Sequence, residues 1–528
     1  MAGQARLSRG GRAARSADQT RPRPRPRTLQ RSVLQTQARA DPSTAEVFIG
    51  GSCADDPSAV YNCSLRSYVS RMEDENTTRL LMHQAWSALG GDLELLDLVQ
   101  VTGQPVGLLP STLAAMPAMT AAVAVSTLAA AVLDRSRGST AWTPVVVDVE
   151  HVAVAARSER YARTASVEGA STFAPLSRFF RTADGWIRLH ANYPWHRERA
   201  LGVLGCADRP EAVEQAVVAW SSEALEDALV AVGALGYAVR DGLAWRAHPQ
   251  GRAVSALPLV QSWAGADPGR VAAPGRAASG LRVLDLTRVI AGPVATRTLA
   301  GWGGEVLRLD SPDLPEIPAQ AVDTLPGKRS AELDLRQSDG RARMEELLGQ
   351  ADLLVQGYRP GALARYGLGP QELADRHPHL STVTLSAWGP VGRWAGRRGF
   401  DSLVQCPTGI ADAEGDGSKP GALPAQVLDH ATGYLAAAAS LLALAGVQRG
   451  QPPRAVQVSL AQTAQWLVSA GTMRRFPQRQ LDAGPYLVTL PGATSAVQVV
   501  GPPGRVGDLT PAWTFTSDLG VDPAAFCV

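Results

Sequence analysis

Residues 281–310 read LRVLDLTRVIAGPVATRTLAGWGGEVLRLD. Two short runs rich in Leu and Val, 281–286 and 305–309, enclose a segment of helical character over 294–302. A strand, a helix and a second strand in this order form a βαβ unit, whose two strands lie parallel in one sheet. The stretch therefore predicts an α/β fold in which a helix covers one face of a parallel sheet.

The same alternation continues beyond this unit. Further strands are predicted at 331–335, 353–356 and 380–386, and further helices at 338–349, 361–366 and 370–376. Repeated alternation predicts an α/β fold with a doubly wound, mainly parallel sheet, in which ligands bind beyond the carboxyl ends of the strands. Thr287 to Pro293 lies at such an end. No Gly-x-Gly-x-x-Gly motif follows the first strand, so the sequence does not indicate a dinucleotide redox cofactor.

Asp429 is a lone carboxylate at the start of an apolar, helix-forming run. It lies in LPAQVLDHATGY, residues 423–434, and an Ala/Leu-rich stretch follows over 435–447. A helix N-terminus carries partial positive charge and free N–H groups, so it can keep a carboxylate ionised where little water is present. Such a carboxylate is suited to act as a covalent nucleophile. The alternative from these residues alone is an ordinary helix N-cap.

Seven segments, in this order, resemble the class III coenzyme A transferases, the family of formyl-CoA transferase, carnitine CoA-transferase and α-methylacyl-CoA racemase. They are 281–293, 303–310, 327–335, 358–367, 399–405, 423–434 and 456–460. The resemblance implies a Rossmann-like CoA-transferase domain in which Asp429 is the nucleophile. It also implies an acyl-CoA donor and a small carboxylic acid acceptor, with CoA moving between them through an aspartyl mixed anhydride and an enzyme–CoA thioester. CoA is then a substrate, and the resemblance implies no permanently bound cofactor.

The same motif matches suggest residues that bind CoA. Arginine and lysine suit its phosphates, and glycine allows close approach of the backbone to the ligand. The candidates are Arg288, Gly292, Lys328, Arg329, Arg359 and Arg365. For each cation the alternative is a surface ion pair, and for Gly292 it is simple turn formation.

Two other functions remain open at this point. The racemase branch of the family carries a catalytic His at the position of Phe400, so proton exchange by two bases is poorly supported here. His430 does not replace it, because adjacent helical side chains diverge, and we expect a structural role for it. The third option is a non-catalytic CoA-binding subunit, suggested by a degenerate copy of the pattern in the first half.

This degenerate copy precedes the intact one. Gly107-Leu-Leu-Pro110 is similar to Gly421-Ala-Leu-Pro424, and each is followed by an Ala-rich helical run and then by a β-rich segment. No Asp or Glu lies between Asp97 and Asp134, so the first copy lacks a counterpart of Asp429 and is predicted to be catalytically silent. The order resembles a tandem offshoot of the family. The family resemblance implies a homo-oligomer, such as an intertwined dimer, whereas a fused chain could complete its site alone.

The predicted organisation has six parts: a disordered basic tail (1–45), a helical degenerate segment (46–160), a small α+β domain (161–263), a linker (264–279), the CoA-transferase α/β domain (280–470) and a C-terminal tail (471–528). The basic tail is predicted because residues 1–40 hold ten arginines and one acid. The small domain is marked by a hairpin at an Asp184-Gly185 turn, followed by helices at 195–204 and 222–232.

Composition narrows the functional class further. The net charge of +2 over 528 residues does not point to nucleic acid or to a membrane surface. The five cysteines are scattered and include no Cys-x-x-Cys pair, so their spacing does not predict a structural metal site. The same pattern is typical of a protein from a reducing cytoplasm. The stretch from Val99 to Leu133 has no charged residue, but three prolines interrupt it, so it predicts a buried helix and not a membrane span.

Overall fold

The computed structural model describes residues 57–165, 173–266, 268–492 and 494–527. The chain divides into two compact units, residues 1–60 and 61–528. All elements below belong to the second unit, except the first four residues of α1 (Pro57–Ala88). The basic tail predicted over 1–45 lies outside the described residues.

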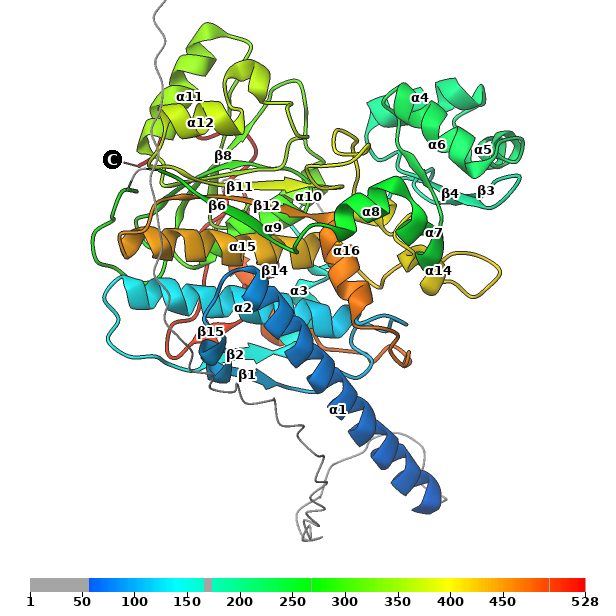
Figure 1. Ribbon diagram of the computed structural model, residues 1–528, viewed down its shortest axis with the longest axis horizontal. Helices are drawn as coiled ribbons and strands as arrows, with labels where there is room; N and C mark the ends of the chain where they lie inside the picture. Colours follow the sequence, from blue (N-terminus) through cyan, green and yellow to red (C-terminus); the bar gives the residue numbers. More distant parts are fainter. Residues whose placement is uncertain (1–56, 166–172, 267, 493, 528) are drawn as a thin grey trace, which may run out of the picture. The chain divides into compact units, whose positions relative to one another are not determined.

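A seven-stranded sheet is the largest of the second unit (Figure 1). Its strands lie in the order β6-β12-β11-β10-β7-β8-β9, and every pair is parallel except β6 with β12. Numbered along the chain from β7, the six parallel strands follow the order 3-2-1-4-5-6, with the reversal between β7 and β10. The strands are β6 (Gln261–Ala264), β7 (Arg282–Leu286), β8 (Glu305–Asp310), β9 (Lys328–Glu332), β10 (Leu353–Gln356), β11 (Ser381–Ser386) and β12 (Arg454–Ser459).

One strand prediction was displaced along the chain. The strand expected at 331–335 is β9 at Lys328–Glu332, three residues earlier. Leu333 and Leu335 lie beyond the strand but still pack against a buried apolar cluster. They continue the apolar alternation of the strand, and this is why the pattern alone placed the strand too late.

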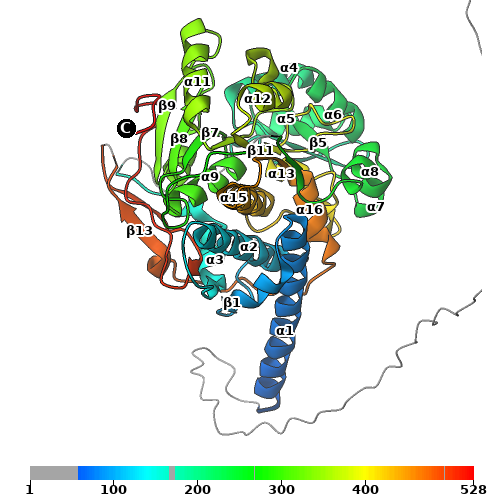
Figure 2. The ribbon, with the colours of Figure 1, turned by 60° about the vertical axis from the view of Figure 1, so that its left-hand side comes forward.

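Both faces of the main sheet are covered. Val283 of β7 packs into a core shared with α9 (Ala291–Gly301) and α15 (Val427–Gln448). Its neighbour Leu284 faces a second core formed with α11 (Ser338–Gln350). Adjacent strand residues point to opposite faces, so helices on both sides leave the strand without a solvated face. Figure 2 shows α9 and α15 on one side and α11 on the other.

The internal repeat has a structural counterpart. In the first half, α2 (Ala115–Ser136) connects β1 (Val99–Thr102) to its parallel neighbour β2 (Val145–Asp148). In the second half, α15 connects β11 to its parallel neighbour β12. Both helices are 22 residues long. The third residue of α15 is Asp429, and the third residue of α2 is Pro117, which cannot serve as a nucleophile.

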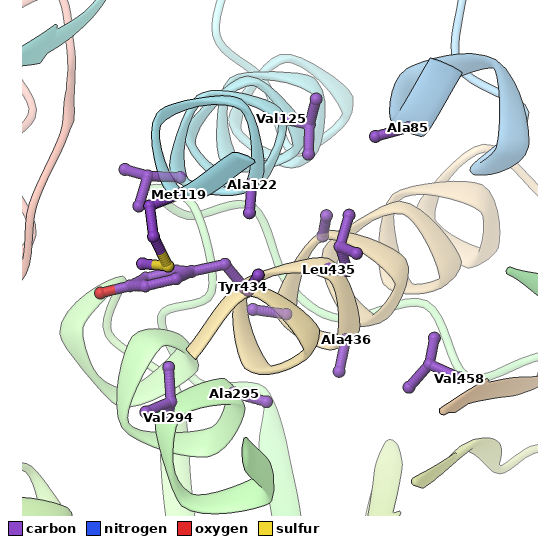
Figure 3. Packing of buried hydrophobic residues seen from close by; sticks show 14 of the residues in the cluster. Ala85, Met119, Ala122, Val125, Val294, Ala295, Tyr434, Leu435, Ala436 and Val458 are labelled. Carbon is purple, nitrogen blue, oxygen red and sulfur yellow. The ribbon is translucent and has the colours of Figure 1, made fainter. Parts of the chain in front are cut away.

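The two long helices pack against each other in the core. Figure 3 shows Ala122 and Val125 of α2 facing Leu435 of α15, and Met119 against the ring of Tyr434. Small side chains on both helices let the two backbones approach closely. Each helix is long and apolar enough to cross a membrane, yet 100% of the apolar window of α2 and 94% of that of α15 are buried inside the protein. The charge-free stretch thus contains a buried helix, which begins only at Ala115.

A small α+β region follows the first repeat. The antiparallel strands β3 (Phe179–Arg181) and β4 (Trp186–Leu189) form a hairpin, and β5 (Gly236–Ala238) pairs with β4. The turn lies at Asp184-Gly185, where the Thr182 amide donates to the Gly185 carbonyl at 3.0 Å. Three helices cover the sheet and share a core with it: α4 (Pro194–Leu204), α5 (Pro210–Val217) and α6 (Ser222–Ala231).

The predicted linker and the C-terminal tail are both packed onto the fold. Just before the linker, β6 adds an antiparallel edge to the main sheet, and no strand was predicted there. The Arg137 side chain donates hydrogen bonds to the Ala277 and Ser279 carbonyls, which holds the linker against α2. In the tail, β13 (Leu487–Leu490) pairs with β14 (Val497–Val500), and β15 (Arg505–Val506) extends the sheet of β1 and β2.

The remaining elements are short. They are η1 (Leu93–Leu98), α3 (Val149–Ala155), η2 (Ser158–Arg160), α7 (Gly242–Ala247), α8 (Pro249–Ser255), α10 (Pro318–Thr324), η3 (Ala364–Tyr366), α12 (Pro370–Arg376), α13 (Asp401–Val404), α14 (Ile410–Ala413), α16 (Leu460–Ser469) and η4 (Gly484–Tyr486). The helix predicted at 361–366 is only the short 3-10 turn η3. Gly361, which has a φ of +79°, falls outside it because that conformation is incompatible with a helix.

Candidate active site

A cavity of about 550 Å3 lies at the carboxyl ends of the parallel strands. The residues that end or follow these strands line it: Thr287 after β7, Asp310 of β8, Leu333 after β9, Gly357 after β10 and Ala387 after β11. Parallel sheets with this strand order bind ligands at this edge, where the reversal of strand order opens a crevice. The fold therefore places the cavity where the sequence predicted a binding site.

Asp429 lies in the wall of this cavity. It is the third residue of α15, its side chain belongs to the first turn, and it is 6% exposed. No residue in the described part of the chain donates a hydrogen bond to its carboxylate. The helix N-terminus offers partial positive charge, but the carboxylate oxygens remain free to contact a ligand. A buried, unoccupied carboxylate facing a cavity is the arrangement that a covalent nucleophile needs.

Asp401 supports the backbone at Asp429. Its Oδ2 accepts a hydrogen bond from the Asp429 amide at 3.0 Å, and its Oδ1 accepts one from the Gln405 side chain. Burial raises the pKa of Asp401 to about 6. Burial, and then the charges of Asp401 and Glu159, raise the pKa of Asp429 well above its usual value. The site therefore holds a carboxyl group that ionises at a higher pH than an exposed Asp.

Glu159 reaches this cluster from the first half of the chain. It belongs to η2, is 5% exposed, and its Oε2 lies 3.7 Å from Nε2 of His430. Burial acts to raise the pKa of Glu159, but His430 outweighs it and holds that pKa below the usual value. His430 itself is fully buried and does not line the cavity. The distance is that of an ion pair and is too long for a hydrogen bond.

Arginines surround the outer part of the cavity. Arg359, Arg365 and Arg398 line it, and within the described ranges none of their guanidinium groups forms an ion pair or a hydrogen bond. Burial, followed by the charges of Arg359 and Arg199, lowers the pKa of Arg398. Unpaired arginines that repel one another gain from binding an anion between them. Arg398 was not among the residues predicted from the sequence.

Arg288 and Gly292 also line the cavity, in two different roles. Arg288 has a partner, because its Nε lies 3.5 Å from Oε2 of Glu316. Gly292 is required by packing, since a Cβ atom there would lie 2.3 Å from Cβ of Thr287. A side chain at 292 would thus displace the loop that follows β7.

Lys328 and Arg329 correct the predicted set, because the structure does not bring them to the cavity. Lys328 is fully buried, and its Nζ donates to Oδ2 of Asp285 at 3.0 Å and to Oγ1 of Thr296 at 2.6 Å. Burial lowers its pKa to about 8. Arg329 pairs with Glu305 at 2.7 Å. Both cations are thus paired with carboxylates of the protein. The sequence had left open a surface ion pair, whereas the pair of Lys328 with Asp285 is fully buried.

Three lining residues come from the small α+β region and were missed entirely. Tyr193, Trp195 and His196 lie at or near the start of α4 and face the same cavity as Asp429. The Tyr193 hydroxyl donates to Oε1 of Glu316 at 2.8 Å. No local pattern marks these residues, because their role depends on a contact between segments more than 200 residues apart in the chain. Among the residues that the structure describes, no group of three His, Cys, Asp or Glu side chains is placed to hold a metal ion.

Comparison with known proteins finds a match in sequence for the part of the chain that holds Asp429. Residues 278–487 match the model described as CoA-transferase family III. This segment is thus similar in sequence to the members of that family. It contains β7 to β12, the helix of Asp429 and every unpaired arginine of the cavity.

Individual relatives carry transferase names. A protein of Mycobacterium tuberculosis named "Probable fatty acyl-CoA transferase" is 34% identical over 36% of this chain and 52% of its own length. A formyl-CoA:oxalate CoA-transferase of Bradyrhizobium is 28% identical over 40% of this chain and 52% of its own. A succinyl-CoA:glutarate CoA-transferase of Mus musculus is 29% identical over 31% of this chain and 41% of its own length. The chain spans about half the length of the curated relatives that it matches.

A crystal structure of the mycobacterial protein is also similar. It shares 33% sequence identity, covers 36% of this chain and 55% of the solved chain, and has a TM-score of 0.34.

Proposed function

We propose that the protein transfers coenzyme A between carboxylic acids, with Asp429 as the covalent nucleophile. A carboxylate oxygen of Asp429 attacks the thioester carbonyl carbon of the donor, the C–S bond breaks, and CoA leaves as a thiolate. The product is a mixed anhydride. The thiolate then attacks the Asp429 carbonyl carbon, which releases the donor acid and forms an enzyme–CoA thioester.

The acceptor acid repeats these steps in reverse. Its carboxylate attacks the Asp429 thioester, the thiolate leaves, and a second mixed anhydride forms. The thiolate attacks the acyl carbon of the acceptor, so that Asp429 is regenerated as a carboxylate. No net proton or electron is exchanged, and no bound cofactor enters the reaction.

The observation that carries this proposal is the environment of Asp429. Its carboxylate is buried at a helix N-terminus, accepts no hydrogen bond from the described residues and opens onto a 550 Å3 cavity. Exclusion of water protects an anhydride from hydrolysis, and an unsolvated carboxylate is a stronger nucleophile than a hydrated one. The family match of residues 278–487 supports CoA-transferase chemistry in general.

The unpaired arginines supply the binding site for CoA. Arg359, Arg365 and Arg398 line the cavity, and their forked donors suit phosphate oxygens. Gly292 lets the backbone after β7 lie at the cavity surface, close to Asp429. Three of these four residues, Gly292, Arg359 and Arg365, were suggested by the sequence motifs, and Arg398 is new. Arg288 is kept as a paired, positioning cation.

A racemase on the same scaffold has less support. The position of its second base is Phe400, which cannot exchange a proton. The histidine stacked on Phe400, His190, has a pKa that burial lowers to about 3, so it would be a very weak base.

We further propose that one chain completes its own site. Glu159, Tyr193 and Trp195 belong to segments that precede the family-matched region. Within one polypeptide Glu159 lies beside His430, and Tyr193 and Trp195 line the same cavity as Asp429. A monomer or a simple dimer in size-exclusion chromatography with light scattering is expected. An obligate tetramer or larger assembly would argue against completion by a single chain.

Trapping the covalent intermediate tests the proposed chemistry. The protein is incubated with a panel of acyl-CoA esters, treated with hydroxylamine or borohydride, and the modified peptide is identified by mass spectrometry. A modification on Asp429 that is absent from Asp429→Asn is expected. Asp313→Asn is the matched control, because Asp313 lines the same cavity but is 57% exposed and paired with Arg336. Measurable CoA binding without modification by any ester would favour a non-catalytic subunit.

A further inference from the structure

A row of four stacked aromatic rings contributes three of its members to the wall of the cavity. We define the aromatic row as His190, Tyr193, Trp195 and Phe400. The centroids of His190 and Phe400 are 4.2 Å apart, those of Tyr193 and Trp195 are 4.8 Å apart, and those of Tyr193 and Phe400 are 6.3 Å apart. In each pair the planes differ by less than 30°. The row joins a ring of the family-matched segment to three rings of the small α+β region.

Phe400 connects the row to the residue that supports the backbone at Asp429. Phe400 immediately precedes Asp401, whose Oδ2 accepts the hydrogen bond from the Asp429 amide. Phe400 and Asp429 both line the cavity, as do Tyr193 and Trp195. An acyl group bonded to the carboxylate of Asp429 would therefore occupy the same cavity as Phe400 and Trp195.

The row is rigid, and it leaves aromatic surface available. Tyr193 is held through its hydroxyl by Glu316 and lies under the guanidinium of Arg288, 5.7 Å from the ring centroid. Phe400 and Trp195 are only partly buried in the absence of a ligand. Flat rings held in place bind another flat ring without losing conformational freedom.

Two histidines, His190 of the row and His196 beside it, carry no charge at neutral pH. Burial lowers the pKa of His190 to about 3 and that of His196 to about 4. Both lie beside Phe400, with His196 at a centroid distance of 6.4 Å. The two histidines therefore add no charge to this side of the cavity at neutral pH, where the Glu316-paired Arg288 lies over Tyr193.

The charges around the cavity disfavour a second carboxylate on the acyl group. Arg288 is paired with Glu316, and Arg397 is paired with Glu226 and Asp227. The three lining arginines that have no ion-pair partner among the described residues are those assigned above to the phosphates of CoA. Near Asp429 the neighbouring ionisable groups are Asp401, Glu159 and His430, and the two carboxyls would repel another anion.

We propose that the acyl subsite accepts monocarboxylic acids that carry a flat, unsaturated or aromatic group, which stacks on Phe400 and Trp195. The inference rests on the proposed function, because it concerns the acyl group that Asp429 receives. Dicarboxylic donors are expected to be poor substrates.

Competition between donors tests the inference. The trapping experiment is repeated with equal concentrations of phenylacetyl-CoA, hexanoyl-CoA and succinyl-CoA. Phenylacetyl-CoA is expected to modify Asp429 about tenfold faster than either competitor, as aromatic stacking beyond simple apolar contact allows. Equal or faster modification by succinyl-CoA or hexanoyl-CoA overturns the inference but leaves the proposed transferase function intact.

Binding to the Asp429→Asn variant provides a second readout that needs no chemistry. Titration calorimetry is expected to show about tenfold tighter binding of phenylacetyl-CoA than of succinyl-CoA. Trp195→Ala is expected to reduce this ratio towards one, whereas Trp263→Ala, an exposed Trp of the edge strand β6, is expected to keep it. An unchanged ratio in Trp195→Ala, or equal affinities in the parent variant, overturns the inference even if no ester modifies Asp429.

Discussion

Oε2 of Glu159 lies 3.7 Å from Nε2 of His430, the residue that follows Asp429 in α15. Glu159 is held in place by its neighbour Ser158, whose hydroxyl donates to Oδ2 of Asp323 at 2.8 Å and accepts from Arg297 at 3.0 Å. A buried network thus fixes a carboxylate of the first half beside α15 in the second half. The degenerate copy of the repeat therefore contributes a charged residue next to Asp429, although it has no counterpart of Asp429 itself.

Replacement of Glu159 tests this contribution through the pH dependence. Asp429 must be ionised to attack, so activity falls as the pH drops through its pKa. Burial, Asp401 and Glu159 all raise that pKa. Glu159→Gln removes one negative charge, so the acidic limb of kcat/KM is expected to move to lower pH. Glu150→Gln is the control, because Glu150 also lies in the first half but is paired with Arg479. An acidic limb that stays in place or moves upward would contradict this coupling.

The unpaired arginines are expected to act on binding. Arg359→Ala and Arg398→Ala each remove a charge-assisted hydrogen bond to phosphate, which contributes about 1.5–3 kcal/mol. The KM for acyl-CoA should then rise roughly ten- to hundredfold, with a smaller change in kcat. Arg329→Ala is the matched control, because Arg329 is paired with Glu305 outside the cavity lining. An equal effect of all three substitutions on KM would show that the effect is not local to the cavity.

The buried Lys328–Asp285 pair is expected to matter for stability. Lys328→Met would leave Asp285 as an uncompensated charge in the core, which lowers the free energy of unfolding by about 3–5 kcal/mol. The double variant Lys328→Met with Asp285→Asn removes that charge and should recover part of the loss. Urea denaturation measures the free energy of unfolding of the single and the double variant. A single variant as stable as the parent protein would contradict the role assigned to this pair.

Two glycines of α15 provide a matched pair of substitutions. At Gly433 a Cβ atom would lie 2.6 Å from the Ala291 carbonyl oxygen, so Gly433→Ala should destabilise the protein by about 1–3 kcal/mol. It should also lower activity, because Ala291 lines the cavity. At Gly446 the nearest atom is the end of the flexible Gln451 side chain, 2.9 Å away. Gly446→Ala should therefore be neutral or stabilise by up to about 1 kcal/mol. Thermal unfolding of the two variants measures this difference. A lower melting temperature for Gly446→Ala than for Gly433→Ala would contradict the prediction.

Sequence patterns predicted much of the second half because its signals are local. The alternation of apolar runs and helical segments from 281 to 386 depends on burial along one strand or one helix face, and five strands were expected there. Asp429 was found for the same reason, as its place at the start of an apolar helix is visible in the sequence alone. The edge strand β6 was missed because an isolated strand of four residues carries little periodicity.

Charge partners could not be predicted in the same way. Lys328 and Arg359 look alike as cations in family motifs, but one is buried against Asp285 and the other faces the cavity without a partner. Whether a cation is neutralised depends on which carboxylate the fold brings within a few ångströms, and that distance is not encoded in local spacing.

The amino-acid pattern alone thus predicted the α/β class, a mainly parallel sheet, the internal repeat and the place of Asp429 at the start of a helix. The folded chain was needed to show that Glu159 lies beside His430, that Tyr193 and Trp195 line the same cavity as Asp429, and that Lys328 does not. Strands and helices follow from periodic burial within short segments. An active site depends on contacts between segments far apart in the chain, which exist only after the layers have packed.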